Sequence, residues 1–524
     1  MKKVLSLIMA AVMLLSLVSC GSNNSNSTPP NSSTPEAVKP GGEVKYADAV
    51  TLAIEAGLDK LDPGEVWSAA LDMYFSCVFE TLVKYDGTTG KITPWLAETA
   101  EFTDENNNRI HIILRDNIYF SNGEKLTTAD VEYSIARTAR STIRQYYDSC
   151  EIVDDREMYI NMSNTCGEWL GALGISFSSI VCKSAAEANA EGKALIGTGP
   201  FVYDMDSYVV ENRLTLNRNE NYWGELPVTK QLKFVLIKDA SARAVALDNG
   251  DVDYTQNLNA NEVPIYQAKA GLTVVPYPST RFVFIGFNDK RDSDSVTKEE
   301  LALRRAIACA INRDEIVAAL GETNASPMIS MWRPDSAYIA DESEFDIDLS
   351  YNPEQAKKYL AEANTAKITC VVNSNDGRSK LAAQVVQEQL RQVGITMTIS
   401  ESDSAGVNAL STAENPTFEM LINTNLITFL PCAGWTFFQA KSDVNKTAMN
   451  DPKILAALDI VMTTADLNKK IENLKIIQKE NHDQVSYLPL FWAENSYAYR
   501  KGVENFSIEA SGVAHIVGIR KVVD

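Results

Sequence analysis

Apolar residues occur along this chain in two patterns, short continuous runs and longer stretches with an apolar position every three or four residues. Residues 281–287 (RFVFIGF) form a nearly continuous run, as expected of a strand buried on both faces. Residues 299–320 and 467–484 show helical spacing, and we expect the first of these helices to break near Asn312. Residues 487–492 (YLPLFW) predict another strand. This alternation of strands and helices indicates an α/β fold.

Polar residues and glycines mark the ends of further helices. Asn352 has the side chain of an N-cap, and Pro353 follows at the first helical position. Apolar positions between 381 and 393 lie on one helix face, and Gly394 can end that helix in a left-handed turn. Residues 395–399 (ITMTI) then predict a strand.

The start of the chain has the features of an export signal. Lys2 and Lys3 precede an apolar stretch at residues 4–18, shorter than the roughly 20 apolar residues of a membrane-spanning helix. The stretch ends in Leu-Val-Ser-Cys-Gly, with the cysteine at position 20, and resembles a bacterial lipobox. We therefore expect a lipoprotein signal peptide at residues 1–20 and anchoring to membrane lipid through acylation of Cys20. An ordinary signal peptide with a chance cysteine is the alternative.

Residues 21–42 are rich in Ser, Asn, Pro and Gly and predict a flexible linker between the lipid and a folded body. We expect the protein on the outer side of the cell membrane, facing the extracellular space or the periplasm.

Composition narrows the class of protein. The chain has 524 residues, of which 45% are hydrophobic and 22% charged, enough for a folded body with more than one core. Its net charge of −21 becomes −23 when Lys2 and Lys3 leave with the signal peptide. Nucleic-acid binding needs a basic surface that replaces phosphate counterions, so we expect no nucleic-acid partner.

Seven cysteines remain in the chain besides Cys20, and this odd number leaves at least one thiol unpaired. Cys166 and Cys182 could form a local disulfide. The preferred interpretation is that most cysteines are small buried apolar residues.

The search for catalytic and metal-binding motifs gives almost nothing. The three histidines at 111, 482 and 515 form no ligand pair. The chain has no phosphate-binding loop, dinucleotide-binding loop or nucleophile elbow. We expect no catalytic residues, no metal site and no cofactor, although a catalytic triad can also be assembled from distant residues.

A series of short sequence segments instead resembles the segments of a known protein family. They are, in chain order, residues 61–63 (LDP), 80–86 (ETLVKYD), 92–98 (ITPWLAE), 114–123 (LRDNIYFSNG), 126–131 (LTTADV), 197–201 (GTGPF), 218–224 (RNENYWG), 250–253 (GDVD), 286–288 (GFN) and 304–308 (RRAIA). Over essentially the whole chain from about residue 43, this series resembles the family 5 extracellular solute-binding proteins of ABC importers. Most of these residues have structural explanations; for example, we expect Gly197 and Gly199 to flank a tight crossover where a side chain would collide.

The resemblance implies an α/β, two-lobed periplasmic-binding-protein-like fold (type II, cluster C) with an extra subdomain in the first lobe. Lobe 1 would comprise residues 43–83, 190–276 and 493–524, the subdomain residues 84–189, and lobe 2 residues 277–492. The resemblance further implies a monomer that closes its lobes over a solute, performs no chemistry, and delivers the solute to ABC permease subunits.

Candidate ligand residues come partly from the resemblance and partly from topology. In peptide-binding members, a tryptophan-rich segment supplies an aspartate for the amino terminus of the ligand. The matching segment here, residues 423–431 followed by Trp435, has no aspartate, although Glu494 could substitute. Its Asn423 and Asn425 could bind amides or hydroxyls, with Trp435 stacking on the ligand. Topology adds four further candidates: Trp67, Arg281, Trp332 and Trp492.

Each candidate has a structural alternative, which is core packing for the tryptophans and a surface ion pair for Arg281. The expected ligand is an oligopeptide or a peptide-like solute, and an oligosaccharide is the alternative. A sensor or adhesin of the same fold, without transport, and a secreted hydrolase with an assembled active site also stay open.

Overall fold

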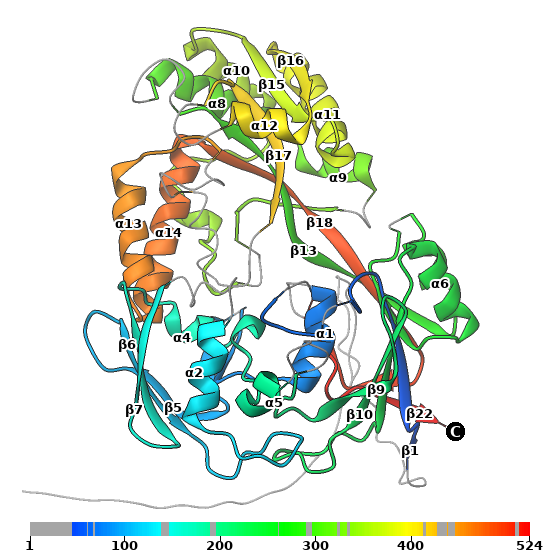
Figure 1. The fold of residues 1–524 in the computed structure, drawn as a ribbon. Coiled ribbons are helices and arrows are strands. Elements are labelled where there is room, and N and C mark those ends of the chain that lie inside the picture. The colour runs from blue at the N-terminus through cyan, green and yellow to red at the C-terminus, as the bar shows by residue number, and fades with distance from the viewer. Residues whose placement is uncertain are drawn as a thin grey trace, which may run out of the picture. The chain divides into compact units, whose positions relative to one another are not determined.

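One mixed sheet of eleven strands extends through the protein (Figure 1). The computed structural model describes residues 44–524 except 60, 66–68, 88, 138–145, 189–194, 260, 290–295, 322–324, 333–335, 412–415, 427–437, 439–445, 509–512 and 524. The strand order is β16 (Thr396–Ser402), β15 (Lys367–Asn373), β17 (Met420–Leu426), β13 (Leu272–Phe287), β18 (Tyr487–Arg500), β12 (Tyr254–Gln256), β2 (Ala49–Ile54), β11 (Gln231–Leu236), β10 (Arg213–Arg218) and β9 (Phe201–Val209), with β14 (Ala325–Pro327) beside β18.

Strands β13 and β18 are shared by the two halves of this sheet. They pair antiparallel along their length, from Leu272 opposite Arg500 to Gly286 opposite Tyr487. Strand β18 is longer than the predicted run, because its pairing with β13 continues beyond Trp492. Lys45–Asp524 forms one compact unit, so the boundaries of lobe 1, lobe 2 and the subdomain stay predictions.

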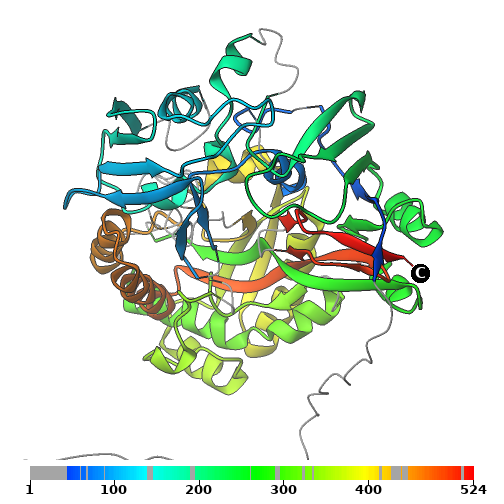
Figure 2. The same ribbon diagram turned by 90° about the horizontal axis from the view of Figure 1, so that it is seen from below.

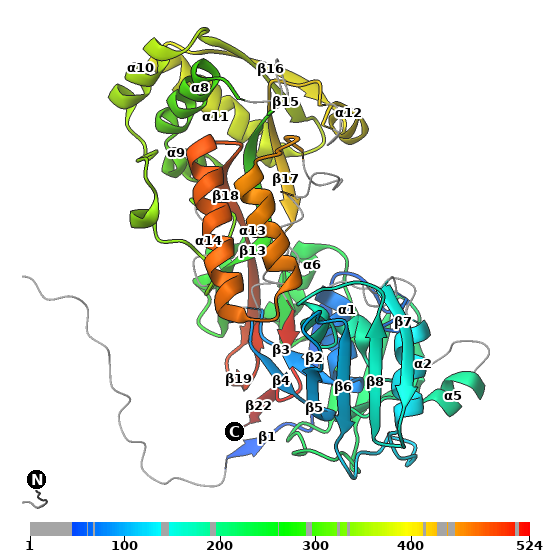
Figure 3. The same ribbon diagram turned by 90° about the vertical axis from the view of Figure 1, so that its left-hand side faces the viewer.

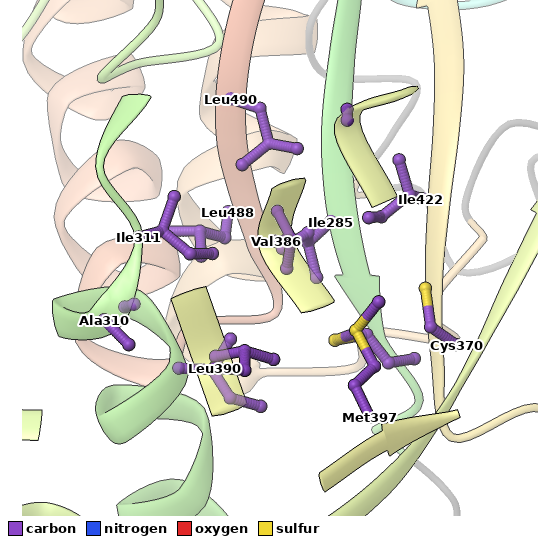
Figure 4. Close-up of a cluster of buried hydrophobic side chains, with 14 of the residues drawn as sticks. Ile285, Ala310, Ile311, Cys370, Val386, Leu390, Met397, Ile422, Leu488 and Leu490 are labelled. Carbon is purple, nitrogen blue, oxygen red and sulfur yellow. The ribbon is translucent and has the colours of Figure 1, made fainter. Parts of the chain in front are cut away.

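Helices cover both faces of the half-sheet made by β13, β17, β15 and β16. One face packs against α8 (Lys298–Ala310), α9 (Arg313–Leu320), α10 (Pro353–Glu362) and α11 (Gly377–Val393), and Figure 4 shows part of this core. The other face packs against α12 (Ser404–Leu410), α13 (Pro452–Thr463) and α14 (Leu467–Gln484). A short 3₁₀ turn at Glu342–Glu344 lies in the connection before α10.

The predicted helix ends are confirmed. Asn312 interrupts the first helix and caps α9, its side chain accepting hydrogen bonds from the amides of Asp314 and Glu315. Asn352 caps α10 in the same way, and Gly394 ends α11 with φ of 95°. The strand predicted at 395–399 begins one residue later, because the amide of Ile395 still bonds the Leu390 carbonyl of the helix.

The other half of the sheet carries α1 (Ala69–Val78), α6 (Ala240–Asn249) and α7 (Val263–Gln267). The chain ends meet in a small sheet of β1 (Lys45–Tyr46), β22 (Arg520–Val523) and β19 (Val503–Glu504), whose strands lie side by side in Figure 2. Strands β20 (Ser507–Ile508) and β21 (Ala514–His515) form a separate pair.

The predicted subdomain contains a four-stranded antiparallel sheet, seen face-on in Figure 3. Its order is β5 (Ala97–Phe102), β6 (Arg109–Leu114), β8 (Glu157–Met162) and β7 (Tyr147–Ile152). Around it lie the hairpin β3 (Val83–Tyr85) and β4 (Ile92–Pro94), together with α2 (Thr128–Arg137), α4 (Trp169–Ala172), the 3₁₀ turn Ser176–Ser178 and α5 (Lys183–Ala188).

Glu80 joins four of the sequence segments that carried the resemblance. Its carboxyl group, 7% exposed, accepts hydrogen bonds from the indole nitrogens of Trp95 and Trp223, the hydroxyl of Tyr222 and the hydroxyl of Thr198, each at 2.8 Å. Burial raises the pKa of Glu80 and the four hydrogen bonds oppose that rise. These segments therefore identify a scaffold, as the sequence predicted.

The local disulfide that the sequence allowed between Cys166 and Cys182 is not formed. Both residues are free thiols, as are Cys77, Cys150, Cys309 and Cys370. Burial raises the pKa of half-buried Cys150 and of buried Cys309 to about 11, so both thiols stay protonated at neutral pH. In the described part of the chain, no helix has the length and apolarity needed to cross a bilayer.

Candidate ligand-binding site

Four of the predicted ligand residues lie on three neighbouring strands, β17, β13 and β18. In the register, Phe282 on β13 is opposite Asn425 on one side and Trp492 on the other. Arg281 is opposite Leu426, and Phe284 is opposite Asn423. The structure thus brings together residues that are up to 211 positions apart in sequence, at the point where β13 enters the second half of the sheet.

Asn423, Asn425 and Trp492 share one face of the sheet, because directly paired residues of antiparallel strands point the same way. Both asparagines are half-buried. Trp492 is 1% exposed and its ring centre lies 5.5 Å from that of Phe282. In the structure Trp492 packs in the hydrophobic core, and its contact with a ligand stays a prediction.

Trp332 belongs to the same aromatic core. It is 5% exposed and its ring stacks on Phe438 with an interplanar angle of 2° and 6.5 Å between centres. Phe438 is fully buried and lies close in sequence to the predicted stacking residue Trp435. Trp67, Trp435 and Cys20 are outside the described residues, so their predicted roles stay predictions.

Arg281 points to the opposite face, where the N-terminus of α11 meets β17. Its side chain is exposed and makes no ion pair within the part of the chain that the structure describes. The surface ion pair considered from the sequence is therefore not present among those residues. This leaves a cation within β13, opposite Leu426 at the end of β17.

Arg378 is a residue that the sequence reasoning missed. It lies in the first turn of α11, is half-buried, and has no side-chain hydrogen bond or ion pair to any described residue. Burial and then the nearby positive charge of Arg281 lower the pKa of the Arg378 guanidinium. The charges of the two arginines thus act on each other, the nearby Asp376 carboxylate opposes this effect, and neither arginine forms an ion pair with a described residue. This arrangement favours an anionic group.

The neighbouring carboxylate, Asp376, is already engaged. It caps α11 through the amides of Arg378 and Ser379, and accepts hydrogen bonds from the hydroxyls of Ser379 and Thr424. Burial would raise the pKa of Asp376, but these hydrogen bonds outweigh it and lower the pKa. Asp376 therefore fixes the start of α11 against β17 and so holds Arg378 in place.

The other half of the sheet presents polar groups at the carboxyl ends of its parallel strands β2, β11 and β12. Glu55 follows β2 and accepts a hydrogen bond from the side-chain amide of Asn257, which follows β12, at 2.9 Å. Arg243 on α6 is buried and donates to the backbone carbonyls of Ile237, Lys238 and Asn257. Ligands of open α/β sheets bind at such strand ends. Glu55 also forms an ion pair with Arg243 at 3.4 Å, and its side chain is 40% exposed.

Metal-binding chemistry has little support in the described part of the chain, where no group of three or more His, Cys, Asp and Glu side chains could hold an ion. His111 instead bonds Glu157 at 2.9 Å and stacks on Tyr159. His482 bonds the carbonyl of Ile347 and stacks on Phe345.

The two halves of one sheet, joined by β13 and β18 and carrying polar groups at their strand ends, define a two-lobed solute-binding protein. Comparisons with known proteins agree. Residues 91–443 match the family model "Bacterial extracellular solute-binding proteins, family 5 Middle". The chain therefore belongs to family 5 of the bacterial extracellular solute-binding proteins, as the sequence segments indicated.

Three similar proteins illustrate this membership. A nickel-binding periplasmic protein of Escherichia coli (strain K12) is 25% identical over 84% of this chain and 88% of its own length. A dipeptide-binding protein of the same organism is 21% identical with the same coverage. The solved structure of HbpA2 from Haemophilus parasuis superposes with a TM-score of 0.81 at 19% identity, covering 91% of this chain and all of its own, and shows the shared fold.

Proposed function

We propose that this protein is the substrate-binding lipoprotein of an ABC importer and that it captures a peptide-like solute with a free carboxylate. The observation that carries the proposal is that Arg281 and Arg378 are close enough for their charges to interact, while neither side chain forms an ion pair with a described residue. A ligand carboxylate would pair with the two guanidinium groups through charge-assisted hydrogen bonds. For a ligand ammonium, the candidate carboxylates are Glu55, which follows β2, and Glu494, which lies within β18 opposite Pro278.

Capture would occur by closure of the two lobes about β13 and β18. Pro276 lies in β13 and Pro489 in β18, and a proline ring fixes one backbone dihedral, so bending would concentrate in the neighbouring residues. Ligand stabilises the closed form only if it binds that form more tightly than the open form. The closed form would then dock on the permease, and the protein itself would perform no chemistry.

Substitution of Arg378 by glutamine tests the carboxylate site. We expect native mass spectrometry of freshly purified protein to find one small molecule per chain, and thermal shift to find stabilisation by a dipeptide and tripeptide library. Arg378→Gln should weaken peptide binding roughly 10- to 100-fold, because it removes a charge-assisted hydrogen bond. C-terminally amidated peptides should bind the wild-type protein as weakly as free peptides bind the variant.

The matched control is Arg391→Gln on the same helix. Arg391 is exposed near the other end of α11 and pairs with Glu388 at 2.7 Å, so its loss should leave peptide binding unchanged. Equal binding of amidated and free peptides would contradict the carboxylate site. Stabilisation by oligosaccharides alone would favour the alternative ligand, for which Asn423 and Asn425 are the supporting residues.

The lipid anchor is tested at Cys20. In cells that express the Cys20→Ala variant, we expect the protein to move from the membrane pellet to the soluble fraction, because one lost attachment site removes both acyl chains. Cys150→Ala serves as the control and should leave the protein in the pellet. A wild-type protein that fractionates as soluble would favour the ordinary signal peptide. Uptake of labelled peptide, lost on deletion of the gene, would separate an importer from a sensor or adhesin.

A further inference from the structure

The subdomain and lobe 2 meet at a second place, away from β13 and β18. Figures 1 and 3 show the ends of α13 and α14 directed toward the subdomain. There the amide of Gly167 donates to the carbonyl of Met462 at 2.9 Å, and Asn107 donates to the carbonyl of Thr463 at 2.8 Å. The C-terminal end of α13 is thus bonded to two loops of the subdomain.

A buried ion pair lies at the centre of this contact. Lys470, in the first turn of α14, pairs with Glu168 and also donates to the carbonyl of Gly167 at 2.9 Å. Each charged side chain is only 9% exposed. Both charges are therefore withdrawn from water here, and each depends on the other because an unpaired buried charge is strongly unfavourable.

The subdomain and lobe 2 approach each other closely at this contact. A Cβ atom on Gly167 would lie 1.6 Å from the carbonyl oxygen of Thr464 in the α13–α14 connection. A Cβ atom on Gly90, at the tip of the β3–β4 hairpin, would lie 1.6 Å from the hydroxyl of Tyr338 in lobe 2. These close approaches at two separate points, one by a backbone carbonyl and one by a side-chain hydroxyl, indicate a built interface.

We propose that this contact is a closure latch, in which Glu168 and Lys470 meet only when the lobes are closed. Residues far from the hinge strands move most during a hinge rotation, so opening would part the α13–α14 connection from the subdomain. In the open form both charges would regain water and neither would be stranded. Removal of one partner therefore penalises the closed form selectively.

The experiment compares Lys470→Met, Glu168→Gln and the double variant by small-angle X-ray scattering of the mature chain. Bound solute is first removed by denaturation and refolding. We expect Lys470→Met to shift the ratio of closed to open molecules toward the open form by about 100-fold, seen as a larger radius of gyration. The double variant should recover most of the shift, because it leaves no charge stranded.

The control is Lys453→Met, which breaks the pair with Glu480 between the same two helices inside lobe 2. It should leave the radius of gyration unchanged. An unchanged radius in Lys470→Met with a lowered melting temperature would overturn the proposal, because the contact would then persist in both forms. Asn107→Ala, which removes one hydrogen bond and strands no charge, gives a second measurement and should produce a smaller shift in the same direction. This test needs neither ligand nor permease, so its result is independent of the proposed transport.

Discussion

Substitution of Gly197 by alanine is expected to lower the free energy of unfolding by about 4 kcal/mol or more, among the largest effects of a single substitution. The added Cβ would lie 2.0 Å from the carbonyl oxygen of Val78 and 2.8 Å from the ring of Phe79. The backbone cannot move aside freely, because the amide of Gly199 donates to that same carbonyl at 3.0 Å. The tight crossover predicted at Gly197 and Gly199 is thus confirmed, and urea unfolding measures its cost.

Gly271→Ala is the matched control for this substitution. No atom lies within 4 Å of the position that its Cβ would occupy. Its unfolding free energy should stay within about 0.5 kcal/mol of the wild type. A Gly197→Ala protein that unfolds at the wild-type urea concentration would contradict the steric account.

Substitution of Glu80 by glutamine is expected to lower the free energy of unfolding by roughly 3 to 5 kcal/mol. Each carboxyl oxygen accepts two hydrogen bonds, and the donors come from Trp95, Tyr222, Trp223 and Thr198. In glutamine one oxygen becomes an NH₂ group, which accepts none, so two buried donors lose their acceptor and face another donor. Thermal and urea unfolding measure the loss.

Glu98→Gln controls for the loss of a carboxylate in the same region. The Glu98 side chain is 59% exposed and its ion pair with Arg156 spans 3.3 Å. Because exposed pairs contribute little, the change should be below about 1 kcal/mol. If the Glu80 and Glu98 substitutions lowered the free energy of unfolding equally, the four buried hydrogen bonds of Glu80 would contribute no more to stability than an exposed ion pair.

Local patterns predicted the elements and their ends well. Asn312, Asn352 and Gly394 act where the sequence indicated, because each cap depends on bonds to residues a few positions away. The strand ending at Phe287 and the helix at 467–484 follow from hydrophobic spacing alone. The α/β class followed from the alternation of strands and helices, but the two-lobed fold came from the ordered segments, since periodicity does not specify strand order.

The candidate site was harder to predict, because its residues meet only through the register of distant strands. Arg281 and Asn425 were predicted from position along the chain, and pairing of β13 with β17 brings them to adjacent strands. Arg378 was missed, although the sequence DGRS at 376–379 before an apolar helical pattern is an N-cap signal at the end of a strand. Nothing in the sequence indicates that Lys470 pairs with Glu168, 302 positions away.

The pairing of β1 with β22 has a consequence for biogenesis. Lys45 is opposite Val523, and the amide of Ala47 bonds the carbonyl of Lys521, so the first strand of the body depends on the last. A nascent polypeptide cannot complete this sheet until its final residues have been synthesised. The three-stranded sheet of β1, β22 and β19 therefore closes late in folding, after the strands of the large sheet have been synthesised.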